Sequence, residues 1–278
     1  MKETLRLDYE IGPEIGRGRF GTVYRCSSLA SGEEFAVKSI DKALLSDTLD
    51  RDLALREAKI HQIAAAGNPH AVQIHAAYED ADSLHLVLDL CPGPDLFARV
   101  SDRAPLPERD AAAVMLPLME AIAACHRRGI AHRDVKLENV LFDGRGKLKL
   151  ADFGSAECFD DGRRRAMTGL VGTPYYVAPE VVAGREYGEK VDVWSCGVIL
   201  YMMLGGMAPF CGESAVEILE AVLRGNLRFP PRIFRGVSTA AKDLIRKMLC
   251  KDVSRRFSAD QVLRHPWMLT GGEPASED

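Results

Sequence analysis

Four polar residues between His132 and Gly154 could carry out chemistry together: Asp134, Lys136, Asn139 and Asp152. Their types suit phosphoryl transfer, which requires a protein mainly to position the reactants and to neutralise charge on the phosphates. Asp134 could accept the proton of an attacking hydroxyl, and the oxygens of Asn139 and Asp152 could bind Mg²⁺. Lys136 could neutralise the transferring group. The stretch therefore predicts phosphate chemistry on a short strand–loop–strand segment.

The same stretch contains His-Arg-Asp-Val-Lys-Leu-Glu-Asn and then Asp-Phe-Gly, which resembles the catalytic and metal-binding loops of the eukaryotic protein kinases. The alternative is that these are ordinary turn residues, and for Asp-Phe-Gly alone that alternative is at least as good. The complete spacing favours the kinase interpretation. The resemblance covers residues 9–268 and implies ATP and Mg²⁺ as cofactors, with Asp134 as the base and Asn139 and Asp152 as metal ligands.

The fold implied by the resemblance is α+β. It is the bilobal protein kinase fold, with a five-stranded antiparallel N-lobe that carries one main helix and a mainly helical C-lobe. We expect the N-lobe at about 9–88, the hinge at 89–94 and the C-lobe at about 95–268. Residues 269–278 would then be a short flexible tail.

A glycine-rich turn lies between the first two of three strands expected over residues 8–40. Gly16, Gly18 and Gly21 form a G-x-G-x-x-G pattern, in which the missing side chains let backbone N–H groups approach phosphates. The pattern also marks dinucleotide-binding folds, but there it opens a helix, whereas here Thr-Val-Tyr continues as a strand. The next strand brings Ala-Val-Lys with Lys38, as in the kinases. We therefore favour an ATP phosphate loop.

Lys38 is expected to contact the α and β phosphates, held by a carboxylate from the helix predicted over residues 49–65. Glu57 lies inside that helix and is the predicted partner. His61 departs from the family, because kinases usually carry an apolar residue there. It is either a partly exposed helix histidine or a residue whose protonation loosens the helix, since a charged imidazole is costly in a core. An unchanged pH–activity profile in His61→Leu would rule out the second alternative.

Two further strands, expected at 71–78 and 83–90, lead to the hinge. By resemblance, backbone groups of Asp89 and Cys91 contact adenine, and Asp95 meets the ribose. The residues implied for ATP binding are Ile15, Gly16, Gly18, Gly21, Val23, Ala36, Lys38, Asp89, Cys91, Asp95 and Leu141.

The second half of the chain is predicted to be helical. Helices are expected from Pro107 to Gly129, at 191–204, at about 214–224 and 238–250, and from Ser258, which has a glutamine three residues on as in a capping box. By resemblance, Asp192 anchors the backbone of the catalytic loop, and Glu180 pairs with Arg256. Both would be buried charges, which are tolerable only when partnered.

The catalytic loop also bears on the substrate. Lys136 stands in Asp-x-Lys-x-x-Asn, the pattern of serine/threonine kinases, and Thr173 is expected to hydrogen-bond towards Asp134 and Lys136. Asp95 and Glu138 would form an acidic pair that favours Arg or Lys before the target serine, with a discrimination on the order of 1–3 kcal/mol. The alternative is that these two acids contact only water.

The motifs Asp-Leu-Phe at 95–97 and Tyr-Tyr-Val-Ala-Pro-Glu at 175–180 resemble the calcium/calmodulin-dependent branch, nearest to the plant calcium-dependent kinases. Those kinases carry an autoinhibitory helix and EF-hands after the catalytic domain, and this sequence contains no D-x-D-x-D-G loop. A bare domain opening Ile-Gly-Arg-Gly-Arg-Phe-Gly-Thr-Val most closely resembles the plant phosphoenolpyruvate carboxylase kinases. That resemblance implies calcium independence, control by abundance, and phosphorylation of a serine near the N-terminus of phosphoenolpyruvate carboxylase.

Other function classes remain as alternatives. The chain could be the catalytic domain of a calcium-dependent protein kinase with other substrates, which a longer transcript would favour. A pseudokinase scaffold would usually lack one of Lys38, Asp134 and Asp152, and all three are present. A small-molecule kinase is disfavoured because the segment 172–180 serves peptide binding in the kinases.

The activation segment departs from the family at one position. Arg133 would normally be neutralised by a phosphothreonine or an acid three positions before Gly172, and that position is Gly169. We expect the segment to be ordered without that pair, and the alternative is phosphorylation of Thr168. Cys158, flanked by acids that disfavour a thiolate, is the candidate for thiol control, as a mobile exposed cysteine.

Bulk properties bound the remaining possibilities. A chain of 278 residues with 47% hydrophobic and 27% charged residues is an ordinary globular protein that can bury a core. Its formal net charge of −4 gives no reason to expect nucleic acid or a membrane surface as a partner. The seven cysteines have no metal-ligand spacing. No apolar run is long enough to span a bilayer, and no signal peptide is evident. A cytoplasmic monomer is expected.

Overall fold

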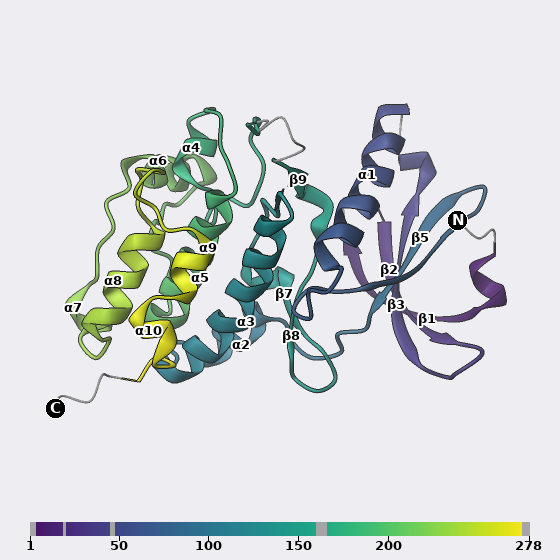
Figure 1. Cartoon of the computed structure of the whole chain (residues 1–278), viewed down its shortest axis with the longest axis horizontal. Helices are drawn as coiled ribbons and strands as arrows, with labels where there is room; N and C mark the ends of the chain where they lie inside the picture. The colour runs from purple at the N-terminus through teal and green to yellow at the C-terminus, as the bar shows by residue number, and fades with distance from the viewer. Residues whose placement is uncertain (1–3, 19–20, 45–47, 160–165, 274–278) are drawn as a thin grey trace. The chain divides into compact units, whose positions relative to one another are not determined.

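The computed structural model describes residues 4–18, 21–44, 48–159 and 166–273. The chain divides into two compact units. Unit 1 comprises Met1–Gly93 with Phe142–Lys149, and unit 2 comprises Pro94–Leu141 with Leu150–Asp278. Figure 1 shows the strands of unit 1 in purple and blue and the helices of unit 2 in teal, green and yellow.

Unit 1 contains the predicted five-stranded antiparallel sheet, in the order β1-β2-β3-β5-β4. Its elements are η1 (Leu5–Leu7), β1 (Tyr9–Gly18), β2 (Gly21–Ser28), β3 (Glu34–Asp41), η2 (Lys42–Leu44), β4 (Ile74–Glu79) and β5 (Ser83–Asp89). The strand expected at 71–78 begins later, because the Ala71 N–H donates to the Asn68 carbonyl in a turn at 3.2 Å. Only after that turn does the chain enter the sheet.

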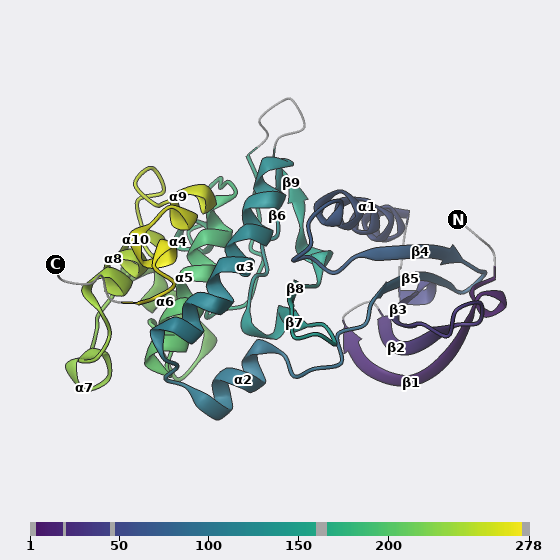
Figure 2. The ribbon, with the colours of Figure 1, turned by 60° about the horizontal axis from the view of Figure 1, so that its bottom comes forward.

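A single long helix, α1 (Thr48–Ala65), accompanies this sheet and confirms the helix predicted over residues 49–65. Figure 2 shows α1 running along one face of the sheet beside β4, with which it makes contact. Ile60 and Ala64, four residues apart, are 4% and 0% exposed, as expected for the inward stripe of a surface helix. A separate cluster that includes Val37 and Val87, neighbours on β3 and β5, packs within the unit.

Unit 2 is mainly helical, as predicted. Its helices are α2 (Leu96–Arg103), α3 (Glu108–Arg127), α4 (Pro179–Val182), α5 (Lys190–Gly205), α6 (Ala215–Arg224), α7 (Pro231–Phe234), α8 (Thr239–Met248), α9 (Ala259–Leu263) and α10 (Pro266–Leu269). Helix α5 is mainly apolar, is buried along nearly its whole length and packs against α3 and α8, as expected for a helix that is hydrophobic on most of its surface. The helix expected from Pro107 begins one residue later, at Glu108, and Pro107 is its N-cap.

The charged residues predicted to lie in the interior of unit 2 are paired. Arg256 is 1% exposed and donates through Nη1 and Nη2 to the two carboxylate oxygens of Glu180 at 2.6 and 2.8 Å. Its guanidinium also lies 5.0 Å from the ring centroid of Trp194. The bidentate geometry of the Arg256–Glu180 pair compensates for the burial of both charges.

The capping box predicted at the start of α9 is also present, formed by Ser258 and Gln261.

Short strands hold the loops that carry the candidate residues. They are β6 (Ile130–Ala131), which pairs with β9 (Glu157–Cys158), and β7 (Val140–Phe142), which pairs with β8 (Leu148–Leu150). The single turns η3 (Leu137–Asn139) and η4 (Phe153–Ser155) complete this part of the chain. At the other end of unit 2, Gly272 N–H donates to the Trp267 carbonyl at 3.0 Å, so residues 270–273 of the expected tail follow α10 in a turn. The rest of that tail, from residue 274, lies outside the described residues.

Candidate active site

In unit 1, Lys38 and Glu57 form the expected pair. The Nζ of Lys38, on β3, lies 2.7 Å from Oε1 of Glu57, on α1, and the two side chains are only 17% and 10% exposed. The sheet fixes the lysine and the helix fixes the carboxylate, so the ammonium is held in one place. A positioned lysine of this kind can bind phosphate oxygens as a point charge.

The glycine-rich turn joins β1 and β2, in which Gly16 is opposite Val23 and Gly18 is opposite Gly21. At Gly21 a Cβ would lie 2.0 Å from the Ser39 carbonyl oxygen, so this glycine is required by the close approach of β3. The aromatic residue of the turn, at position 20, lies outside the described residues. Ile15 just before the turn is 49% exposed.

Two apolar residues that the resemblance implies for ATP binding lie on neighbouring strands. Val23 on β2 is opposite Lys38, and Ala36 on β3, which is 6% exposed, is opposite Leu88 on β5. Their placement follows from the antiparallel register, which sets which residues of adjacent strands face one another.

Asp89 at the end of β5 is tied down through its side chain. It accepts hydrogen bonds from Lys149 Nζ and His75 Nε2, each at 2.8 Å, and from the Gln73 N–H at 3.1 Å. Burial alone would raise its pKa, but these donors outweigh it and lower the pKa of Asp89. Its own N–H donates to the Gln73 carbonyl, so an adenine contact through Asp89 would use another backbone group. Burial raises the pKa of the nearby Cys91 thiol to about 11.

In unit 2, the catalytic loop gathers the residues that the sequence singles out. Asp134 Oδ2 lies 2.7 Å from Lys136 Nζ, and Asp134 Oδ1 accepts from the Thr173 hydroxyl at 3.0 Å. Lys136 Nζ also lies 3.4 Å from the Thr173 oxygen, as expected. The Asn139 amide nitrogen donates to the Asp134 carbonyl at 2.9 Å. Lys136 and Thr173 therefore hold the two oxygens of the carboxylate, and Asn139 holds the backbone of the same residue.

Asp192 on α5 anchors the backbone of this loop from below, as predicted. It is 0% exposed, and its Oδ2 and Oδ1 accept from the His132 and Arg133 N–H groups at 2.9 and 2.8 Å. His126 Nε2 lies 2.8 Å from Oδ2. Burial alone would raise the pKa of Asp192, but the hydrogen bond and charge of His126, with the contribution of His132, lower it. The anchor holds Arg133 at φ 68°, a conformation uncommon for a side chain other than glycine.

The metal-ligand candidates lie in adjoining loops of unit 2. Asp152 is the N-cap of η4, with its side chain accepting from the Gly154 N–H at 3.4 Å. His132 Nε2 lies 3.0 Å from the Ala151 carbonyl and the ring lies 4.8 Å from Phe153, which fixes the backbone before and after Asp152. Since the Asn139 nitrogen faces the loop backbone, its side-chain oxygen is the atom that can bind a cation. One carboxylate and one amide oxygen fit Mg²⁺, which takes few protein ligands and keeps several waters.

The residues expected to bind a peptide substrate also lie in unit 2. Asp95 is the N-cap of α2, accepting from the Ala98 N–H at 2.8 Å, and Glu138 is exposed on η3, which packs against α2. At Gly172, with φ 109°, a Cβ would lie 3.1 Å from the Arg133 carbonyl oxygen. This glycine lets the segment that carries Thr173 pass close to the catalytic loop.

Two side chains are less exposed than the sequence analysis predicted. The interpretation of His61 as partly exposed is wrong, because it is 5% exposed and its Nε2 lies 2.7 Å from the Val72 carbonyl oxygen. The description of Cys158 as exposed is also wrong. It is half-buried on β9 opposite Ile130, whereas Cys211 is the exposed cysteine.

Sequence reasoning missed the partners of Arg133. Its Nε donates to the Ser155 carbonyl at 2.6 Å, its Nη2 lies 3.4 Å from Glu157 Oε2, and its Nη1 lies 3.3 Å from the Tyr187 hydroxyl. Tyr187 is 6% exposed and in turn donates to the Gly169 carbonyl at 3.1 Å. No sequence signal identifies Tyr187, which lies far along the chain from Arg133.

Comparison with known proteins agrees with this geometry. The protein kinase domain family matches residues 9–268. Calcium-dependent protein kinase 19 of Arabidopsis thaliana is 41% identical over 279 residues, which is 99% of this chain and 50% of that protein. Calcium-dependent protein kinase 10 of Oryza sativa subsp. japonica is 43% identical over 273 residues, which is 97% of this chain and 45% of that protein. The chain thus spans about half the length of the curated relatives it matches.

The family match covers nearly the whole chain, and the described loops carry the residues that phosphoryl transfer requires. The chain belongs to the protein kinase domain family and is a serine/threonine protein kinase that uses ATP and Mg²⁺.

Proposed function

We propose that Asp134 is the base that orients and deprotonates a substrate serine, and that Lys136 neutralises the transferring phosphoryl group. The observation that carries this proposal is the set of contacts that fix Asp134 to Lys136, Thr173 and Asn139. Lys38 holds the α and β phosphates, with Glu57 as its positioning residue. Asn139 and Asp152 would hold Mg²⁺, which when bound would supply neutralisation of the phosphate charge.

The proposed substrate is a serine near the N-terminus of phosphoenolpyruvate carboxylase. Support comes from the resemblance of the glycine-rich turn and from the acids Asp95 and Glu138, which favour a basic residue before the target serine. Asp95→Ser separates the charge from the helix cap, because serine keeps a capping oxygen for α2. We expect it to raise the KM for an arginine-containing substrate about tenfold. The KM for the same sequence with glutamine in place of arginine should change little.

The activity of this catalytic unit is proposed to be independent of calcium and of phosphorylation of its activation segment. In support, Arg133 has a carboxylate partner in Glu157, and Tyr187 joins Arg133 to the segment at Thr168 and Gly169. These contacts can order the segment without a phosphate. Thr168→Ala should therefore retain activity. Tyr187→Phe should reduce the kinase activity severalfold, because it removes the hydroxyl that orders the segment and one hydrogen bond contributes about 1 kcal/mol. Loss of activity in Thr168→Ala with recovery in Thr168→Glu would overturn the proposal.

The second candidate is the catalytic part of a calcium-dependent protein kinase. Its support is the identity of 40–43% to plant calcium-dependent protein kinases whose length this chain half covers. Such a protein would act on other substrates.

The decisive experiment is the transfer of labelled phosphate from Mg-ATP to phosphoenolpyruvate carboxylase in the presence of a calcium chelator. Asp134→Asn is the control for catalysis. Rapid labelling of one N-terminal serine, absent with the variant, is the expected result. Labelling of generic basic peptides but not of the carboxylase would refute the substrate, and detection of a longer transcript that also encodes calcium-binding loops would favour the second candidate.

A further inference from the structure

A strongly basic stretch of unit 2 surrounds a hollow that takes no part in the proposed catalysis. Residues 228–247 carry six basic side chains and one acid, Asp243, in a chain whose net charge is −4. Since this stretch contributes +5, the rest of the chain carries −9. Asp243 is engaged by Lys247 at 2.9 Å and by His265 at 3.0 Å, so it does not neutralise the others. The basic residues that remain are Arg228, Arg232, Arg235, Lys242 and Arg246.

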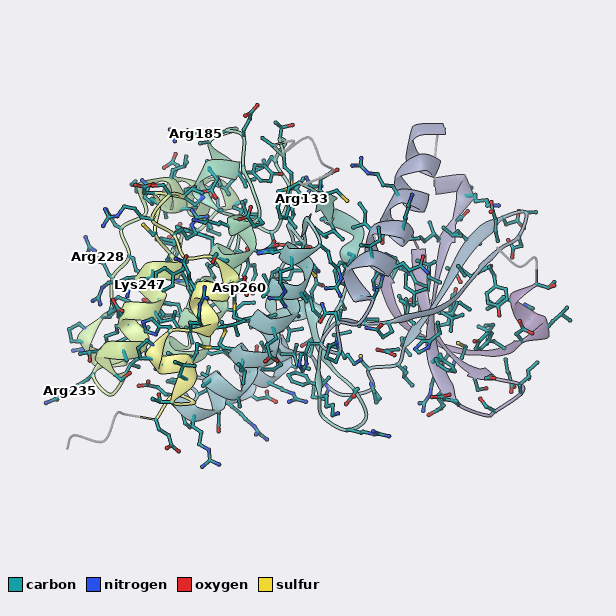
Figure 3. All side chains as sticks on the ribbon, viewed as in Figure 1. Arg133, Arg185, Arg228, Arg235, Lys247 and Asp260 are labelled. Atoms are coloured by element: carbon teal, nitrogen blue, oxygen red, sulfur yellow. The ribbon has the colours of Figure 1, made fainter. Side chains whose placement is uncertain are left out.

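The hollow has a volume of about 640 Å³ and is lined by Phe229, Pro231, Arg232, Phe234, Arg235 and Lys242. It lies at α7 and the start of α8, and Figure 3 shows Arg228 and Arg235 at this end of unit 2. The hollow therefore combines cationic groups with apolar surface.

The floor of the hollow is closely packed against the interior of unit 2. Phe234 is 1% exposed, and its ring centroid lies 5.2 Å from Phe229 and 4.7 Å from Tyr201. A Cβ at Gly205 would lie 2.6 Å from Phe234, so the ring packs directly against the backbone of α5. A preformed apolar floor can receive a side chain at a low cost in conformational entropy.

The rim carries positive charge without carboxylate partners. Arg228, Arg232, Arg235 and Arg246 are exposed, and within the described part of the chain none of them forms a salt bridge with an acid. Lys242 donates to the Val237 carbonyl at 2.7 Å, which positions its ammonium group at the rim. Arg246 lies 4.8 Å from the ring centroid of Phe229 and extends the positive charge beyond the hollow. A cluster of arginines without acidic neighbours is suited to an anionic ligand.

We propose that this surface, named here the α7 surface and formed by Arg228, Arg232, Arg235, Lys242 and Arg246 around the hollow, docks an acidic segment of a partner protein. The segment places carboxylates against the arginines and one apolar or aromatic side chain in the hollow. A concave site with an aromatic floor suits a peptide better than a flat lipid headgroup layer. A long nucleic acid would also meet the −9 carried by the rest of the chain.

The test measures peptide binding and not kinase activity, so its result does not depend on whether the proposed substrate is correct. The probe is a fluorescein-labelled peptide of glutamates around one central phenylalanine, followed by fluorescence anisotropy with the full chain. A peptide with glutamine in place of every glutamate is the neutral control. We expect the acidic peptide to bind much more tightly than the neutral peptide, and its affinity to fall as the salt concentration is raised.

The variant is Arg232→Glu/Arg235→Glu, and the matched control is Arg185→Glu/Arg264→Glu. The control changes the net charge equally at two exposed arginines elsewhere on unit 2, and Figure 3 shows Arg185 far from Arg235 within that unit. The α7 surface variant should bind the acidic peptide about tenfold or more less tightly than the wild type does. The affinity of the control variant should differ from the wild-type value by less than about twofold. Both should melt at the wild-type temperature, because all four side chains are exposed.

Three results would overturn the proposal. One is equal weakening by the two double variants, which would mean that net charge alone attracts the peptide. The second is an absence of acidic-peptide binding. The third is tighter, Arg232- and Arg235-dependent binding to phosphatidylserine vesicles or to a DNA duplex than to the peptide, which would assign the surface to a membrane or a nucleic acid.

Discussion

Replacement of Asp192 by asparagine tests whether α5 positions the catalytic loop. The carboxylate accepts from His126 Nε2 and from the His132 and Arg133 N–H groups, all within 2.9 Å. Asparagine has nearly the same volume but only one acceptor oxygen, so its NH₂ group must face at least one of these donors. The substitution therefore removes the anchor without creating a cavity.

The expected cost follows from the burial and the contacts. A hydrogen bond to a charged group contributes about 1.5–3 kcal/mol, and breaking a buried charge arrangement costs about 3–5 kcal/mol. We expect unit 2 to lose about 3 kcal/mol, which lowers its melting temperature by roughly 6–12 °C. Arg133, held at φ 68°, should then relax and displace the adjacent Asp134. A displacement of about 1 Å at a reacting group can cost on the order of 100-fold in kcat.

The assay combines steady-state kinetics below the melting temperature with calorimetry. Met203→Ala is the matched control, because Met203 is also 0% exposed on α5 and its truncation costs about 2–5 kcal/mol without touching the loop. The Asp192 variant should lose kcat while its KM for ATP stays close to the wild-type value, and the control should keep its kcat. A kcat within about threefold of wild type despite the lower melting temperature would refute the anchoring role.

Three further perturbations have defined outcomes. Because the folded-state pKa of Asp192 is lowered, its contribution is complete above the unfolded value of about 4 and is lost as pH falls through the folded pKa. Acid titration of the unfolding free energy should therefore show a shallower loss below about pH 4 in Asp192→Asn than in wild type, and equal slopes would contradict this. Glu180→Gln leaves the Arg256 guanidinium buried without its carboxylate and should destabilise unit 2 by about 3 kcal/mol in chemical denaturation, whereas a change under about 1 kcal/mol would show that the pair contributes little. His61→Leu leaves the Val72 carbonyl without its donor and should cost about 1 kcal/mol, and an unchanged pH–activity profile would exclude protonation of His61 as a switch.

The sequence predicted well wherever the residues of a feature lie close together in the chain. Asp134, Lys136 and Asn139 fall within one loop, so their contacts follow from a spacing that leaves the backbone few alternatives. The glycine pattern followed by a strand, and the apolar run of α5, identified their elements for the same local reason. The boundaries were less certain, as the late start of β4 shows.

Contacts between residues far apart in the chain were predicted only through the family resemblance, or were not predicted at all. The pairing of Glu57 with Lys38 required the family pattern to choose among several glutamates. Tyr187 and Glu157 were not identified as partners of Arg133, because nothing local distinguishes them from other polar residues.

The sequence by itself therefore determined the chemistry of this protein, since the reacting groups, the glycines and the pattern of strands and helices are properties of short segments. The tertiary structure decided how those groups are held, with Asp192 beneath the catalytic loop and Tyr187 beside Arg133. It also brought the arginines of the α7 surface together around an aromatic floor. The physical reason is that a local spacing restricts distances through the backbone alone. Distant residues become neighbours only when the packing of the whole unit brings their elements together.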